Sequence, residues 1–169
     1  MNEIIESVKN LSIGFNSQKG KQISILRNVS TNIKKGETVG IVGESGSGKS
    51  TLALAMMGYI KQGLFPLKGE CLFKSEDLLK MSSRQLEKIR GRKIAMIPQN
   101  AGQALTPNLK IGYQIDEALR LHTDLKKTER DKKISELLNK VRLPSPETMA
   151  FRYPHELSGG QQQRVAVAM

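Results

Sequence analysis

Apolar and polar residues alternate in two different ways along this chain, and the change falls near residue 100. Before it, short apolar runs rich in Ile, Val and Leu are separated by glycine and polar turns, a pattern typical of β-strands. Residues 16–22 form a polar turn, and 63–69 form a loop that contains Pro66. The predicted strands are residues 5–15, 23–26, 29–33, 38–42, 70–74 and 93–97.

Helical spacing of apolar residues predicts the remaining elements. One helix begins at Lys49 and contains the apolar run 52–60, and a second follows a capping-box pattern at 82–85 and continues to about Arg90. Beyond residue 100 two longer helices are predicted, at 111–122 and at about 128–142, before Pro144 and Pro146 break the chain. The pattern therefore predicts an α/β sheet with parallel strands, followed by an all-helical lobe.

Composition narrows the class of protein. The chain has 169 residues, 38% of them hydrophobic and 25% charged, and its single cysteine, Cys71, excludes an internal disulfide. Its longest apolar run, 52–60, is far shorter than the roughly 20 residues that span a bilayer. The net charge of +11 favours nucleic-acid binding only weakly, because basic residues at 126–133 alternate with acidic ones and aromatics make up 4%.

Candidate chemistry centres on a glycine-rich loop between the predicted strand at 38–42 and the helix from Lys49. The loop matches the spacing G-x-x-x-x-G-K-[ST], in which glycines bring backbone N–H groups close to phosphate. Lys49 would reach the β- and γ-phosphates, and the Ser50 hydroxyl would bind Mg²⁺. A chance Gly/Ser turn is the alternative, and the flanking strand and helix argue against it. The predicted phosphate-binding residues are Gly43, Glu44, Ser45, Gly46, Ser47, Gly48, Lys49, Ser50 and Thr51.

A second candidate anion site opens the last predicted helix. Ser158 and Gln161 have capping-box spacing, and Gly159 and Gly160 between them leave the first-turn N–H groups accessible. Taken alone, this segment is better explained as an ordinary helix start with flexible residues. Its position after a phosphate loop favours a binding role instead.

The order of these motifs resembles that of the ATP-binding cassette of ABC transporters. GESGSGKST at 43–51, a glutamine after Pro98 and LSGGQ at 157–161 carry the resemblance, which covers nearly the whole chain. It implies a P-loop NTPase core with an antiparallel β subdomain and an inserted helical subdomain. The implied domains are 1–99 for the nucleotide-binding core, 100–157 for the helical subdomain and 158–169 for the signature helix.

The resemblance also implies roles for residues outside the phosphate loop. Gln99 matches the glutamine that senses Mg²⁺ and the attacking water, and Phe15 matches the aromatic that stacks on adenine, although locally Phe15 could equally be a core residue. Ser158, Gly159, Gly160 and Gln161 match the segment that closes on the γ-phosphate of ATP held by a second cassette. His155 does not lie where the family's switch histidine lies, and we interpret it as structural.

Narrower features are similar to the importers of oligopeptides, dipeptides and nickel. They are the segment 98–107 with QALTP and the sequence Tyr-Pro-His-Glu at 153–156; Asn100 and Ala101 depart from the usual acidic residue and proline. The implied cofactors are ATP and Mg²⁺. The implied partners are a second cassette, membrane permease subunits and, indirectly, an extracytoplasmic solute-binding protein, with the chain on the cytoplasmic face of the membrane.

The family pattern continues beyond LSGGQ with an aspartate, a catalytic glutamate and a switch histidine. These motifs are absent from the 169 residues, so we expect an incomplete cassette that does not hydrolyse ATP by itself. Two alternatives to an import subunit are a non-transport ABC ATPase and a nucleotide-binding remnant without turnover. A GTPase is disfavoured because the N-K-x-D motif is missing from the sequence.

Overall fold

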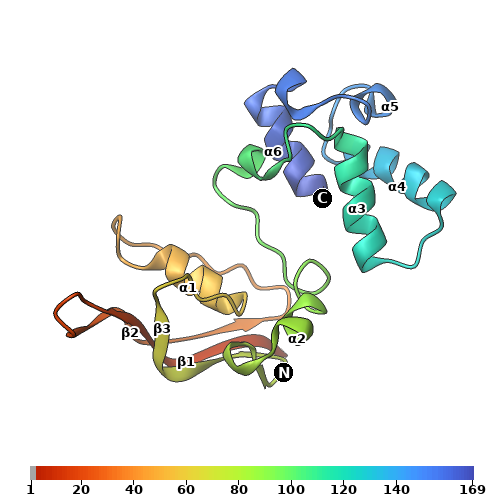
Figure 1. The fold of residues 1–169 in the computed structure, drawn as a ribbon. Coiled ribbons are helices and arrows are strands. Elements are labelled where there is room, and N and C mark those ends of the chain that lie inside the picture. Colours follow the sequence, from red (N-terminus) through yellow and green to blue (C-terminus); the bar gives the residue numbers. More distant parts are fainter. Residues whose placement is uncertain (1–2) are drawn as a thin grey trace. The chain divides into compact units, whose positions relative to one another are not determined.

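The computed structural model describes residues 3–169, which divide into two compact units (Figure 1). The first unit ends at Ile94, and the second runs from Ala95 to Met169. The first contains all the strands of the described chain and the glycine-rich loop. The second is helical and contains the signature segment at 157–161. Each unit is described separately below.

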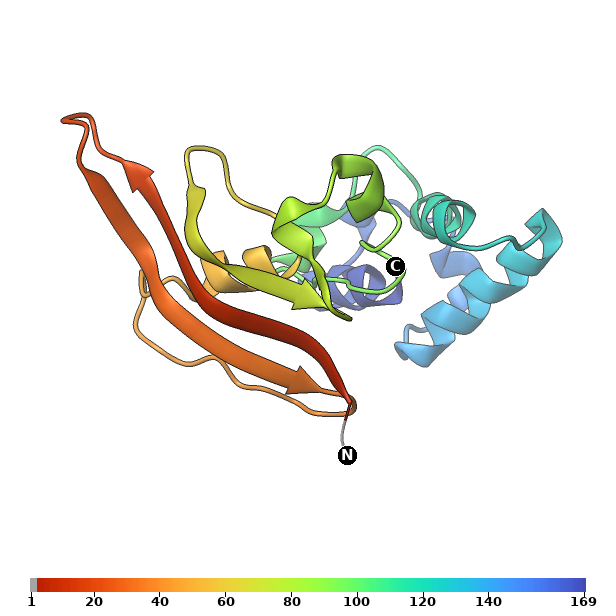
Figure 2. The same ribbon diagram turned by 90° about the horizontal axis from the view of Figure 1, so that it is seen from below.

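A four-stranded antiparallel sheet, in the order β2-β1-β3-β4, dominates the first unit. β1 (Ile4–Asn16) and β2 (Gln22–Lys34) form the long hairpin that Figure 2 shows lying beside β3 (Phe65–Phe73), and β4 (Glu76–Asp77) completes the sheet. The residues predicted as two strands at 23–26 and 29–33 therefore form one, and the loop predicted at 63–69 contains the start of β3.

Helix α1 (Lys49–Met56) packs against β3, and apolar residues of both elements share one core. The helix is shorter than the apolar run 52–60 suggested, because Gly58 adopts a φ of +68° and the Tyr59 N–H bonds back to the Leu54 carbonyl. The 3₁₀ turn η1 (Leu78–Lys80) and helix α2 (Ser83–Glu87) follow the sheet. The buried residues of this core are Val8, Leu11, Ile13, Leu26, Leu52, Ala55, Met56, Cys71, Phe73, Leu78, Leu86 and Ile89.

Helix α2 begins as predicted and ends early. Its capping box is present, with the Ser82 N–H donating to Gln85 Oε1 at 2.9 Å. The helix ends at Glu87 and not near Arg90, since Gly91 turns the chain with a φ of +77°.

The predicted parallel sheet does not form within the described residues. Segments 38–42 and 93–97 are not strands, and the one parallel pairing there is an isolated bridge between Arg90 and Ile94. A strand requires a neighbour for its backbone N–H and C=O groups, and apolar sequence alone does not supply one. Accordingly Val42 is 91% exposed and Ile97 is 56% exposed.

The second unit confirms the predicted helical lobe. It contains η2 (Ala101–Ala104), α3 (Ile111–His122), α4 (Lys127–Lys140), α5 (Pro146–Met149), η3 (Pro154–Glu156) and α6 (Gly159–Ala168). α3 has the predicted bounds, and α4 lies within two residues of them. The core of this unit consists of Leu105, Ile111, Ile115, Ile134, Leu138, Leu143, Met149, Leu157 and Val165. In the part of the chain that the structure describes, no helix is both long and apolar enough to cross a membrane.

One carboxylate lies on the core side of the sheet. Glu6 on β1 is half-buried, and the Cys71 thiol on β3 donates to its Oε1 at 3.8 Å. Burial raises the pKa of Glu6 from 4.5 to about 7, against a smaller lowering by the Cys71 hydrogen bond. Burial, with the charges of Glu6 and Asp77 adding to it, raises the pKa of Cys71 to about 12, so the thiol keeps its proton at neutral pH.

This carboxylate is expected to make the first unit less stable as pH rises. Because the pKa of Glu6 is higher in the folded state, its contribution is complete below about pH 4.5 and is lost as pH rises through about 7. Solvent screening of the half-exposed group reduces the effect to about 1–2 kcal/mol. Urea unfolding at pH 5 and pH 8 should show this loss, and Glu6→Gln should abolish it; an equal pH dependence in both proteins would contradict the assignment.

Candidate functional site

The glycine-rich loop wraps around the ammonium group of Lys49. Nζ of Lys49 donates to the carbonyl oxygens of Gly43 at 2.8 Å and Glu44 at 2.6 Å, and lies 3.5 Å from Ser47 Oγ. The loop therefore holds its own lysine close to its backbone. The ammonium group is therefore already in the loop before an anion binds. A bound anion could replace the two neutral carbonyl oxygens as its hydrogen-bond partner, because a charged acceptor bonds more strongly.

Three glycines allow this loop to turn. Gly43, Gly46 and Gly48 have φ values of +154°, +82° and +92°. At Gly48 the backbone conformation favours glycine, and a Cβ atom would also lie 2.6 Å from Leu26 Cδ2, so the leucine side chain would have to shift. This glycine fixes the loop against β2 and starts α1 at the next residue.

The start of α1 leaves its first N–H groups free of side-chain caps. Gly48 is the N-cap residue and carries no side chain that could bond to them. Ser50 is exposed in the first turn, and Thr51 beside it is half-buried. Together with the helix dipole, these N–H groups suit a phosphate, and the Ser50 hydroxyl oxygen is a ligand that Mg²⁺ accepts. The residues present therefore fit a magnesium-bound nucleotide.

Two other predicted residues lie outside this loop. Phe15 is half-buried on β1, opposite Ile23 of β2 near the end of the hairpin. Gln99 is exposed and belongs to the second unit, two residues before the start of η2. The roles of Phe15 and Gln99 remain predictions.

The signature segment begins α6 with the predicted capping box. The Ser158 N–H donates to Gln161 Oε1 at 3.0 Å, and the Gln161 N–H donates to Ser158 Oγ at 3.4 Å. Gly159 and Gly160 between them are exposed, and a Cβ atom on either would meet nothing within 4 Å. The glycines are thus not required by packing inside this unit, which leaves the first turn of α6 open to a ligand or partner.

The segment before the signature is held by an aromatic cluster. His155 stacks on Tyr153 with ring centroids 5.6 Å apart, and Nζ of Lys110 lies 5.9 Å from the rings of both Tyr153 and Phe151. These contacts agree with the structural role that the sequence suggested for His155.

Sequence reasoning missed two glutamines that organise the helical unit. Gln114 is buried, donates to the carbonyls of Thr106 and Leu109, and accepts from the Thr106 N–H. A signal for it existed, because Gln114 shares the buried face of α3 with Ile111 and Ile115 at helical spacing. The other is Gln162 in α6, which follows the signature directly.

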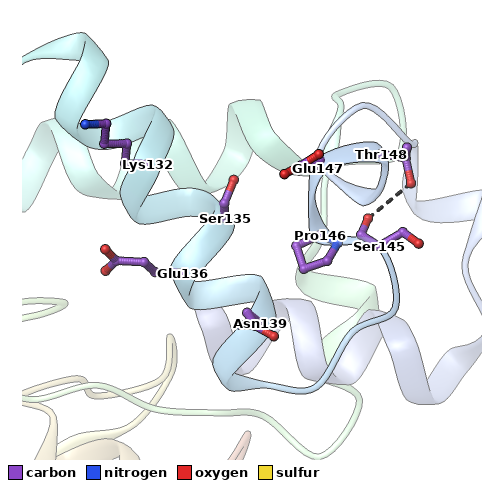
Figure 3. A pocket seen from close by; sticks show the side chains of 8 residues that line it. All are labelled: Lys132, Ser135, Glu136, Asn139, Ser145, Pro146, Glu147 and Thr148. Carbon is purple, nitrogen blue, oxygen red and sulfur yellow. Dashed lines mark hydrogen bonds between the residues drawn. The ribbon is translucent and has the colours of Figure 1, made fainter.

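Two grooves of the helical unit are lined by residues of the described chain other than the motif residues. A groove of about 780 Å³ between α4 and α5 is lined by polar side chains from both helices, as Figure 3 shows, and the Thr148 hydroxyl donates to the Ser145 carbonyl at its edge. A second groove of about 640 Å³ includes Tyr113 and Phe151. No predicted site residue lines either one.

The fold and the two motif-bearing helix starts define a phosphate-loop nucleotide-binding protein with a signature helix. The profile of the family described as ABC transporter matches residues 26–169. The chain belongs to the ABC transporter family, as the motifs predicted. The predicted cassette fold is also confirmed by solved structures: a dimeric ATP-binding cassette with bound ADP and phosphate is 33% identical, with a TM-score of 0.82 over 96% of this chain and 67% of that one.

Two relatives with assigned functions are ATP-binding proteins of transport systems. Oligopeptide transport ATP-binding protein OppD of Bacillus subtilis is 42% identical over 96% of this chain and 45% of its own length. Glutathione import ATP-binding protein GsiA of Salmonella typhimurium is 42% identical over 96% of this chain and 27% of its own length. The chain thus spans less than half the length of each of these relatives.

Proposed function

We propose that this chain is the nucleotide-binding part of an ATP-binding subunit that drives a peptide importer. The observation that carries the proposal is the lysine-centred loop, in which the Lys49 ammonium lies within hydrogen-bond distance of the Gly43 and Glu44 carbonyls at the uncapped start of α1. Oligopeptide transport by one relative supports the class of solute, and glutathione import by the other supports the direction of transport. Nickel, which the sequence left open beside peptides, has no counterpart among these relatives.

Different residues would bind the different parts of Mg-ATP. Lys49 and the N–H groups of the loop and of α1 would bind the phosphates, and the Ser50 hydroxyl would bind Mg²⁺ with Gln99. The bound ion supplies charge neutralisation at the phosphates. Phe15 would stack on the adenine ring. Positioning and charge compensation, and not covalent chemistry, are what this set of residues offers a triphosphate.

The open first turn of α6 supports a second proposal about assembly. Ser158, Gly159, Gly160 and Gln161 would close on the γ-phosphate held by the loop of another cassette, so that two chains enclose two nucleotides. The dimeric state of a solved cassette that is 33% identical supports this arrangement. Closure of such a dimer would act on membrane permease subunits at the cytoplasmic face, supplied with solute by an extracytoplasmic binding protein.

An uptake experiment tests the importer proposal. Deleting the gene that encodes this chain should abolish uptake of a radiolabelled oligopeptide, and expressing the wild-type gene should restore it, whereas the Lys49→Ala gene should not. Uptake of ⁶³Ni²⁺ should be unaffected. Unchanged peptide uptake after deletion would refute the proposal, and a loss confined to nickel would replace the substrate class.

A further inference from the structure

Gln162 connects the start of the signature helix to the turn that precedes it. Its Nε2 donates to the Pro154 carbonyl at 2.8 Å and to the Leu157 carbonyl at 3.2 Å. Gln162 is the fourth residue of α6, and a helical side chain leans toward the N-terminus of its own helix. It therefore reaches back past Ser158, Gly159 and Gly160 to the residue that leads into them. An apolar pair often fixes the entry angle of a helix at these two positions, and here a hydrogen bond replaces it.

The other end of the same amide faces η2. A Cβ atom on Gly102 would lie 2.6 Å from Gln162 Oε1 and 2.9 Å from Gln162 Cβ, so only glycine permits this approach. Gly102 has no positive φ, which means that packing alone requires a glycine there. η2 packs against α6 along this contact, and it begins two residues after Gln99.

We propose that Gln162 is a positioning residue that sets the direction of the Ser158–Gly160 backbone and joins the signature helix to η2. The proposal rests on the proposed function for the meaning of that segment, though not for the contacts themselves. Two flexible glycines in the first turn give the signature backbone little rigidity of its own. The Gln162 side chain starts in the helix after these glycines and bonds to the turn before them, so it restricts their freedom before any ligand arrives.

The donor character of the side chain provides a sharp test. Gln162→Glu keeps the shape and places a carboxylate against two carbonyl oxygens, whereas Gln162→Lys restores a donor on a flexible chain. Gln163 is exposed on the same helix, so Gln163→Glu and Gln163→Lys repeat each charge change without these contacts.

Hydrogen–deuterium exchange of the full chain, without nucleotide, measures the effect. Loss of the two hydrogen bonds in Gln162→Glu should speed exchange in the peptide covering 157–163 by about tenfold. Gln162→Lys should lie near the wild type, and both Gln163 variants should match it. Equal exchange in Gln162→Glu and Gln163→Glu, or no rescue by lysine, would overturn the proposal.

A second comparison separates this inference from the proposed function. An ATP analogue should bind Gln162→Glu as well as the wild type, because the phosphate loop is untouched, while ATP-dependent association of two chains should weaken by about tenfold. A wild-type chain that binds no nucleotide would refute the proposed function and leave the exchange result standing. Wild-type association in Gln162→Glu, despite its faster exchange, would overturn the positioning role.

The contact with η2 is tested by Gly102→Ala. The added methyl group should displace the Gln162 amide and speed exchange in 157–163, since the methyl and Oε1 cannot both occupy their positions. Adding Gln162→Ala removes Oε1, the atom in closest contact, and leaves only the Cβ approach of 2.9 Å, so the effects of the two substitutions should be clearly less than additive. Additive effects of the two substitutions would show that the contact does not exist.

Discussion

Replacing Lys49 with alanine is expected to weaken binding of a fluorescent ATP analogue by about tenfold to a hundredfold. A charge-assisted hydrogen bond contributes about 1.5–3 kcal/mol, and tenfold in affinity corresponds to about 1.4 kcal/mol. The structure adds a reason specific to this loop. Gly43 and Glu44 both direct carbonyl oxygens at the ammonium group, and without it those oxygens would face an incoming phosphate unopposed.

Lys61→Ala provides the matched control, because it removes an equal charge from an exposed residue beyond α1. Its affinity should equal that of the wild type. Titrations with and without Mg²⁺ complete the measurement, and circular dichroism shows whether each variant is folded. Equal affinity of Lys49→Ala and Lys61→Ala would mean that the loop does not bind the phosphates, whatever its resemblance to other loops.

Short-range features of this site could be predicted from sequence because neighbouring residues determine them. The helix start at Lys49 and the capping box between Ser158 and Gln161 both depend on residues within a few positions of one another. Glycines at 43, 46 and 48 fill the positions with positive φ for the same reason. At these positions the local residue types determine the backbone conformation, so the sequence was sufficient to predict it.

Strands were predicted less well because their partners lie elsewhere in the chain. Segments 38–42 and 93–97 are as apolar as β1, yet neither pairs as a strand in the described residues. Part of the loop predicted around Pro66 belongs to β3 instead, because Pro66 pairs with Ile13 of β1. Pairing decides the outcome in both cases, and hydrophobic pattern alone does not reveal pairing.

The side chains that hold the helical unit together were harder still to foresee. Gln162 follows the signature as one of three consecutive glutamines, and nothing in the sequence separates it from Gln163. Gln162 bonds to the Pro154 and Leu157 carbonyls, whereas Gln163 is exposed, and only the structure shows this difference.

Replacing Gly69 with alanine is expected to destabilise the first unit by about 2–5 kcal/mol. Gly69 lies opposite a bulge, where β1 places two residues between its pairs Lys9–Glu70 and Ser12–Lys68. A Cβ atom at Gly69 would lie 2.5 Å from the backbone of Lys9 and Asn10, which cannot move aside as a flexible side chain could. Its φ of +86° adds a cost of about 1–2 kcal/mol to the overpacking cost of about 1–3 kcal/mol.

Gly20→Ala isolates the conformational part of this loss. Gly20 has a similar φ of +73° in the β1–β2 turn, and a Cβ atom there meets nothing within 4 Å. Alanine at Gly20 should therefore cost only about 1–2 kcal/mol. Hydrogen exchange in β1 and β3 should rise far more in Gly69→Ala than in Gly20→Ala, while exchange in α3 and α4 provides an internal reference. Equal protection of the sheet in the two variants would mean that β1 and β3 do not approach each other as closely as 2.5 Å implies, because only the steric contact distinguishes the two glycines.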